Sequence, residues 1–88
     1  MKDYLVIVSL PYGGGSWARG SDRDQTIERC KRILKSDWKS LFKFKKGLVV
    51  KANVLDATGF DNFEWGHMGI TADGKPFTGP IEVVDITY

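Results

Sequence analysis

The segment from Asp56 to His67 holds the side chains that are best suited to chemistry: the carboxylates Asp56, Asp61 and Glu64 and the chain's one histidine, His67. Carboxylates beside a histidine can bind a metal ion or act as general acid and base. Their spacing matches no familiar site, because Glu64 and His67 form a single E-x-x-H on a glycine-containing strand, not the helical H-E-x-x-H of zinc enzymes. A small enzyme or metal-binding protein is therefore the weakest of three interpretations, and we expect no metal.

Residues 11–20 (PYGGGSWARG) form a glycine-rich segment between a predicted strand and a predicted helix, a place where phosphates bind in many folds. The frame closest to a Walker A motif lacks the lysine after Gly20, and Ala18 stands where G-x-G-x-x-G requires its last glycine. We therefore expect a surface loop that binds no nucleotide cofactor. Aromatic and arginine side chains are enriched at contact surfaces. The candidate partner-binding residues of this loop are Tyr12, Trp17 and Arg19.

Cys30 is the chain's one cysteine, so neither an internal disulfide nor a thiolate metal cage can form. This favours a reducing compartment, and we expect a cytoplasmic protein. The apolar run at residues 4–8 is too short for a secretion signal, and far short of the roughly 20 residues that span a bilayer. We expect no membrane association and an inert, buried Cys30.

Charge is segregated along the chain, although the formal net charge is only +2. Residues 1–28 sum to −1, residues 29–51 to +8 and residues 52–88 to −5. At about 100° per residue, five cations share one stripe of the predicted helix and two more follow it. We call this set the basic face: Arg29, Arg32, Lys35, Lys39, Lys43, Lys45 and Lys46. It fits a solvated helix surface, a phosphate-binding stripe or a docking surface for an acidic protein.

An amphipathic helix from about Asp24 to Phe42 must position the basic face. Its apolar stripe has helical period and consists of Ile27, Cys30, Leu34, Trp38 and Leu41. Either Ser21 or Asp22 can cap its start, since each is followed three residues later by a residue that completes a capping box. Gly47 marks the end of the lysine-rich stretch after the helix.

Short β-branched runs predict four strands, over residues 3–10, 48–55, 63–71 and 81–88. The first is apolar almost throughout, which is typical of a central strand. Short turns, including Asp73-Gly74, join the last three strands and favour an antiparallel arrangement. The order β-α-β-β-β predicts an α+β fold of two layers, with one helix packed on a three- or four-stranded, mainly antiparallel sheet. At 88 residues, we expect a single domain over residues 1–88.

A chain of this length spends most of its apolar residues on its own core, which argues against an elaborate enzyme. The leading hypothesis is a non-enzymatic binding or accessory domain that docks onto a larger partner through the basic face and the glycine-rich loop. An inhibitor or modulator encoded by a mobile element would fit this description. The expected partner is a protein with an acidic surface.

Two further questions stay open at the level of sequence. A nucleic-acid-binding protein that uses the basic face is the alternative to a protein-binding domain. The oligomeric state is also open: Glu82 and Asp85 would guard the edge of the last strand against pairing with another chain, yet a symmetric dimer through that edge is compatible with the sequence as well as a monomer.

Overall fold

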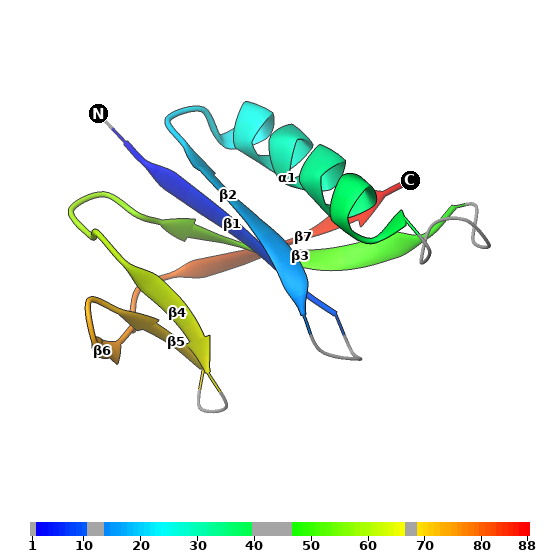
Figure 1. Cartoon of the computed structure of the whole chain (residues 1–88). Helices are drawn as coiled ribbons and strands as arrows, with labels where there is room; N and C mark the ends of the chain where they lie inside the picture. The colour runs from blue at the N-terminus through cyan, green and yellow to red at the C-terminus, as the bar shows by residue number, and fades with distance from the viewer. Residues whose placement is uncertain (1, 11–13, 40–46, 67–68) are drawn as a thin grey trace.

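The computed structural model describes residues 2–10, 14–39, 47–66 and 69–88, and places one helix against a four-stranded antiparallel sheet (Figure 1). The elements in chain order are β1 (Tyr4–Ser9), β2 (Gly15–Gly20), α1 (Arg23–Asp37), β3 (Val49–Asp56), β4 (Phe63–Gly66), β5 (Gly69–Ala72), β6 (Lys75–Pro76) and β7 (Ile81–Thr87). The main sheet has the order β2-β1-β3-β7, and β4, β5 and β6 form a second, smaller sheet. The predicted α+β class, with one helix on a mainly antiparallel sheet, is confirmed.

The strand β2 corrects the prediction of a loop over residues 11–20. Residues 15–20 pair with the whole of β1, from Ser9 opposite Gly15 to Tyr4 opposite Gly20. Alternate side chains explain the strand, because Ser16 and Ala18 are buried while Trp17 is exposed. Glycine is needed at position 15, since its φ is +156° and a Cβ there would lie 1.9 Å from the carbonyl oxygen of Val8.

The chain order therefore begins β-β-α, and the predicted β-α-β-β-β order lacks β2 and two of the short strands. Both neighbours of β1 run antiparallel to it, so no parallel crossover connects β1 to β3 through the helix. β1 lies in the interior of the sheet between β2 and β3, which confirms the prediction of a central first strand.

The helix α1 begins where the sequence placed one of its two candidate caps. The side chain of Asp22 accepts a hydrogen bond from the backbone N–H of Gln25 at 2.9 Å, which satisfies a donor of the first turn. α1 ends at Asp37, with Trp38 as its C-cap. Leu41 and Phe42, which the apolar period assigned to the same helix, lie outside the described residues.

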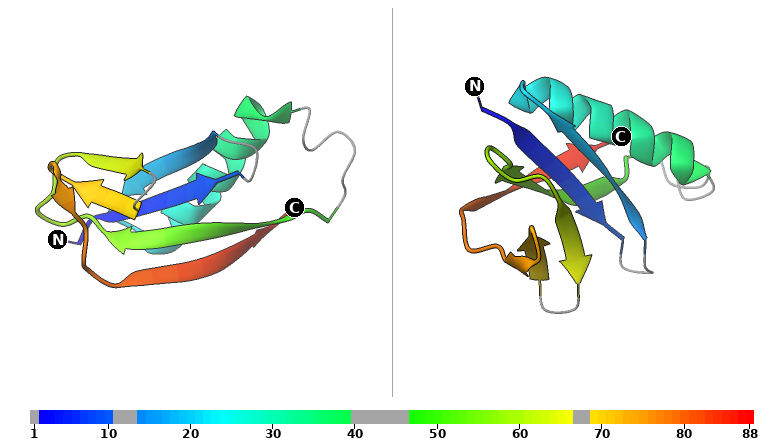
Figure 2. Two further views of the ribbon diagram at one scale, coloured as in Figure 1. Left: turned by 90° about the horizontal axis from the view of Figure 1, so that it is seen from below. Right: turned by 60° about the vertical axis from the view of Figure 1, so that its left-hand side comes forward.

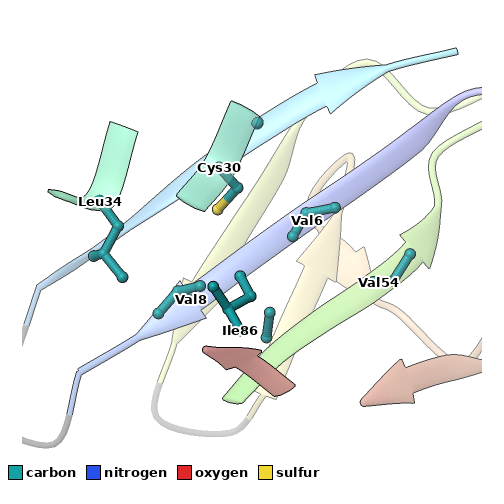
Figure 3. Close-up of a cluster of buried hydrophobic side chains, with 8 residues drawn as sticks. Val6, Val8, Cys30, Leu34, Val54 and Ile86 are labelled. Atoms are coloured by element: carbon teal, nitrogen blue, oxygen red, sulfur yellow. The ribbon is translucent and has the colours of Figure 1, made fainter. Parts of the chain in front are cut away.

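The main core lies between α1 and one face of the sheet (Figure 3). Cys30 and Leu34 of the helix are fully buried against Val6 and Val8 of β1, with Ile86 of β7 in the same cluster. α1 packs mainly on β2 and β1, so it covers one side of this face more than the other. Burying such side chains contributes roughly 1.5–3 kcal/mol each.

A second, smaller core lies on the opposite face of the sheet, beneath β4, β5 and β6. Leu5 and Leu55 of the main sheet pack there against Ala57 and Ile70. The rings of Phe60, Phe63 and Phe77 meet edge to face at the side of this core, with centroids 5.5–5.8 Å apart. The sequence predicted one strand over residues 63–71, and the structure has two, β4 and β5, paired antiparallel from Phe63 opposite Ala72 to Gly66 opposite Gly69.

Candidate functional site

The two surfaces that the sequence predicted for partner binding, the basic face and the glycine-rich segment, lie on opposite sides of the main sheet. Ser16 and Ala18 of β2 face α1, so Trp17 and Arg19 project from the other face of the strand. Arg29, Arg32 and Lys35 belong to α1, which covers the face of the sheet opposite to Trp17 and Arg19 (Figure 2). One flat partner surface cannot contact both, and the two candidates must be considered separately.

The basic face is solvent-exposed where the structure describes it. Its described members are Arg29, Arg32, Lys35 and Lys39, and all four side chains are exposed. None of them forms an ion pair with another residue of the described ranges. Lys43, Lys45 and Lys46 lie outside the described residues.

The cations of the basic face follow the polarity of the helix. Asp24 stands in the first turn of α1 and Lys35 in the last turn, an arrangement that the helix macrodipole favours. Glu28 lies one turn before Arg32, so the outer ridge changes sign from acidic to basic along its length. Along the outer side of α1, acidic residues therefore come before the cations of the basic face, and the charge of this side is not uniformly positive.

Trp17 is the most exposed large hydrophobic residue of the described chain, with 64% of its surface accessible. It borders a groove of about 260 Å³ between the main sheet and the smaller sheet, floored by Leu5 and Ile7 and closed on the far side by Phe63. An exposed tryptophan beside an apolar groove is typical of a contact surface. Tyr12, its predicted companion, lies outside the described residues.

Arg19 is occupied by contacts within the chain. Its Nε donates to Asp3 at 2.8 Å, and its Nη atoms donate to the carbonyl oxygens of Ala57 (3.1 Å), Asp61 (3.2 Å) and Phe60. These bonds tie β2 to the chain that leads into the second sheet. The structure thus gives Arg19 a positioning role beside Trp17, which sequence reasoning missed because the four partners are 16 to 42 residues away.

The carboxylates of the segment from residue 56 to residue 67 do not converge. Asp56 accepts a hydrogen bond from the backbone N–H of Thr58 at 3.0 Å, and its hydrogen bonds with Thr58 lower the pKa of its carboxyl. His67 lies outside the described residues. In the described ranges, no group of three or more His, Cys, Asp or Glu side chains is placed to hold a metal ion.

The turn around Asp61 is held by a carboxylate that the sequence did not single out. Asp73, at a positive φ of 52° after β5, accepts hydrogen bonds from the backbone N–H groups of Asp61 and Asn62. This carboxylate links the entry of β4 to the turn after β5. Asp61 therefore contributes its backbone N–H to a structural link between these two segments.

Cys30 is buried on the helix as predicted, and its Sγ lies 3.9 Å from the carbonyl oxygen of Ser16. Burial raises the pKa of its thiol from an ordinary 9.0 to about 11. The protonated thiol dominates at neutral pH, and this protonated, buried group acts as a small apolar side chain.

Comparison of the chain with models of known families, with curated proteins and with solved structures finds no match. Among the helices of the described ranges, none is both long and apolar enough to cross a membrane.

Proposed function

We propose that this chain is a binding domain that docks onto an acidic surface of a larger protein through the basic face of α1. The observation that carries the proposal is the exposure of four described cations, three on α1 and Lys39 just past its C-cap, without an acidic partner in the described chain. Lys2 and Lys75 are likewise exposed without an ion pair in the described chain, but they lie outside α1 and far apart in the sequence, whereas two other cations are paired. Arg23 pairs with Glu82 and Asp24, and Lys51 pairs with Asp85 at 2.6 Å.

A protein partner agrees better than a nucleic acid with the order of charges on α1. Asp24 and Glu28 stand on the same outer ridge as Arg32, two turns and one turn before it. A phosphate backbone is uniformly negative and would be repelled by Glu28, whereas Asp24 is paired with Arg23 at 2.9 Å. A protein surface can match a ridge that changes sign, which gives specificity as well as attraction.

Docking of this kind acts by occupying a partner's surface, so the activity we propose is that of an accessory or inhibitory subunit. The expected energy is modest for each charge and depends on salt, because the cations are exposed. Trp17 lies on the opposite face of the sheet, so in this proposal it makes a second, separate contact with a partner.

A pair of charge-matched variants tests the proposal. We expect R32E/K35E to lose a stoichiometric protein that the wild-type chain retains from lysate of its source cells. The control K2E/K75E makes the same change in net charge at exposed cations away from α1, and we expect it to keep that partner. Loss in both variants, or in neither, would contradict docking through the basic face.

The nucleic-acid alternative predicts a different result from the same proteins. It requires binding to mixed single- and double-stranded DNA or RNA at low salt, with an affinity that falls about linearly on a log–log plot against salt concentration. A gel shift by the wild type that R32E/K35E abolishes would replace the protein partner with a nucleic acid. We expect no shift.

A further inference from the structure

The last strand, β7, forms one of the two edges of the main sheet (Figure 2). The backbone N–H of Tyr88 donates to the carbonyl oxygen of Leu48, which identifies the residues of β7 that bond to β3. Hydrogen-bonded and non-hydrogen-bonded pairs alternate along an antiparallel ladder. The even-numbered residues of β7 therefore bond to β3, and the N–H and C=O groups of Ile81, Val83, Asp85 and Thr87 point away from the sheet.

Apolar surface gathers beside this edge. Three of the four exposed large hydrophobic residues of the described chain lie here: Val49 of β3 and Ile81 and Val83 of β7. All three project from the face of the sheet opposite α1, because the even-numbered residues of β3 and β7, such as Val84 and Ile86, pack into the core under the helix.

The two acidic residues of β7 are neutralised within the chain. Arg23 of α1 makes two bonds to the carboxylate of Glu82, at 2.5 and 3.1 Å. Lys51 of β3 contacts the carboxylate of Asp85 at 2.6 Å. Both carboxylates that were expected to guard this edge are thus paired with cations on their own faces of the sheet, so they repel another strand less strongly.

The opposite edge, β2, is covered. Gly15, Trp17 and Arg19 are its outward-facing residues, since the backbone N–H of Leu10 donates to Gly14 in the same ladder. Trp38 Nε1 donates to the carbonyl oxygen of Gly15 at 3.3 Å, and the guanidinium of Arg29 donates to that of Arg19. Side chains of α1 therefore occupy two of the three outward carbonyl groups of β2.

We propose that β7 pairs antiparallel with β7 of a second copy of this chain, and that the result is a closed dimer with one continuous eight-stranded sheet. A two-fold axis between the two Val84 residues gives full overlap of the strands. It sets Val83 opposite Asp85 of the second copy and Ile81 opposite Thr87, so that no two acidic residues face each other. The continuous sheet stops at eight strands because its remaining edges are the covered β2 strands.

A second copy suits this edge better than a foreign peptide does. β7 is itself rich in β-branched residues, and its outward groups repeat symmetrically about Val84. The two-fold axis stands perpendicular to the sheet, so both α1 helices lie on the same side of the dimer. Two basic faces on one side would strengthen docking by avidity, yet the pairing of β7 does not depend on that docking.

Sedimentation velocity on the full chain over a concentration series tests the pairing. We expect a monomer–dimer equilibrium and no larger species. Val83→Glu places a carboxylate opposite Asp85 of the second copy, and we expect it to weaken dimerisation by about tenfold or more. Val83→Lys places an opposite charge at the same position, and we expect it to dimerise at least as well as the wild type.

Trp17→Glu is the matched control, because Trp17 is as exposed as Val83 (64% against 59%) and lies on the same face of the sheet, on the other edge strand. We expect it to leave dimerisation unchanged. A second variant, Val83→Pro, removes one outward N–H without touching the ladder to β3, and we expect it also to weaken the dimer.

Three results would overturn the proposal. The first is a wild-type chain that stays monomeric at about 1 mM, the weak end of specific association. The second is a dimer that Trp17→Glu disrupts as much as Val83→Glu. The third is equal weakening by Val83→Glu and Val83→Lys, which excludes Asp85 of the second copy as the residue opposite position 83.

Discussion

The two edge strands of the main sheet are similar in length but differ in what lies beside them. β2 has α1 packed over it, and two of its outward carbonyl groups accept hydrogen bonds from Trp38 and Arg29. β7 has its outward groups free of any partner in the described chain, and Val83 beside them is exposed. A single helix cannot cover four strands, and its position over β2 and β1 decides which edge is available to another chain.

The two halves of the main sheet are also expected to contribute differently to folding stability and to association with another chain. The β2 half of the sheet packs against the buried residues of α1 on one face, and on the other face it carries the hydrogen bonds that Arg19 makes to Asp3 and to the chain after β3. The β7 side contributes Ile86 to the core but exposes most of its other side chains. We therefore expect substitutions near β2 to change folding and substitutions on the outer face of β7 to change association.

The largest expected effect compares Leu34 with Val83. Leu34→Ala removes a fully buried side chain between α1 and the sheet, and we expect it to lower the free energy of unfolding by about 2–5 kcal/mol. Val83→Thr keeps a β-branched side chain at an exposed position, and we expect a change within about 0.5 kcal/mol. Urea unfolding at a fixed low protein concentration measures both. Similar losses would contradict the division of the sheet into a covered and an open side.

Arg19 gives the next largest effect. Arg19→Met removes the hydrogen bonds to Asp3 and to three carbonyl groups, and we expect a loss of about 2 kcal/mol. Arg19→Lys keeps the charge but not the planar fork, so it should recover only a small part of this loss. If Arg19→Lys recovered the full stability, the positive charge alone, rather than the set of hydrogen bonds made by the guanidinium, would connect β2 to the chain that leads into the second sheet.

Trp38 tests the cover of the β2 edge directly. Trp38→Phe keeps an aromatic ring against Gly14 but removes the N–H that donates to Gly15, and we expect a loss of about 1 kcal/mol. The same variant uncovers one outward carbonyl group of β2. If sedimentation then shows species larger than a dimer, the cover by α1 is what stops assembly; an unchanged distribution would assign that role to another feature of β2.

The smallest effect concerns alkaline pH and the thiol under β2. Above pH 9.0 the unfolded chain loses the Cys30 proton, while the folded chain keeps it up to about pH 11. The free energy of unfolding therefore falls as pH rises across this window. We expect Cys30→Ala to remove this part of the pH dependence in urea titrations. Tyr88, whose pKa burial raises to about 12, acts in the same direction at higher pH and remains in both proteins.

The local elements of this fold were predictable from the sequence. The apolar period fixed α1 over most of its length, and the aspartate-rich start contained the cap at Asp22, because both signals depend on residues three or four positions apart. The exposed cations of the basic face followed from the same period. The turn at Asp73-Gly74 was likewise evident from its residue types.

The elements that depend on distant partners were not predictable. β2 contains two glycines and follows two more, so its composition indicates a loop, and only pairing with β1 makes it a strand. The split of residues 63–71 into β4 and β5 depends on Gly69, whose φ is +113°, and on the core around Ile70. The partners of Arg19 and of Asp85 are set by the tertiary fold. The sequence alone therefore did not predict the hydrogen bonds of Arg19 or the ion pair of Asp85 on β7 with Lys51.

Amide hydrogen exchange resolved by residue, measured by NMR over a protein concentration series, tests the contrast between the two edges most directly. We expect the outward amides of Val83 and Asp85 on β7 to become more protected from exchange as protein concentration rises. The outward amides of Trp17 and Arg19 on β2 should keep the same exchange rates throughout. Exchange at Val83 and Asp85 that does not depend on concentration, or protection that grows equally on β2, would contradict this contrast.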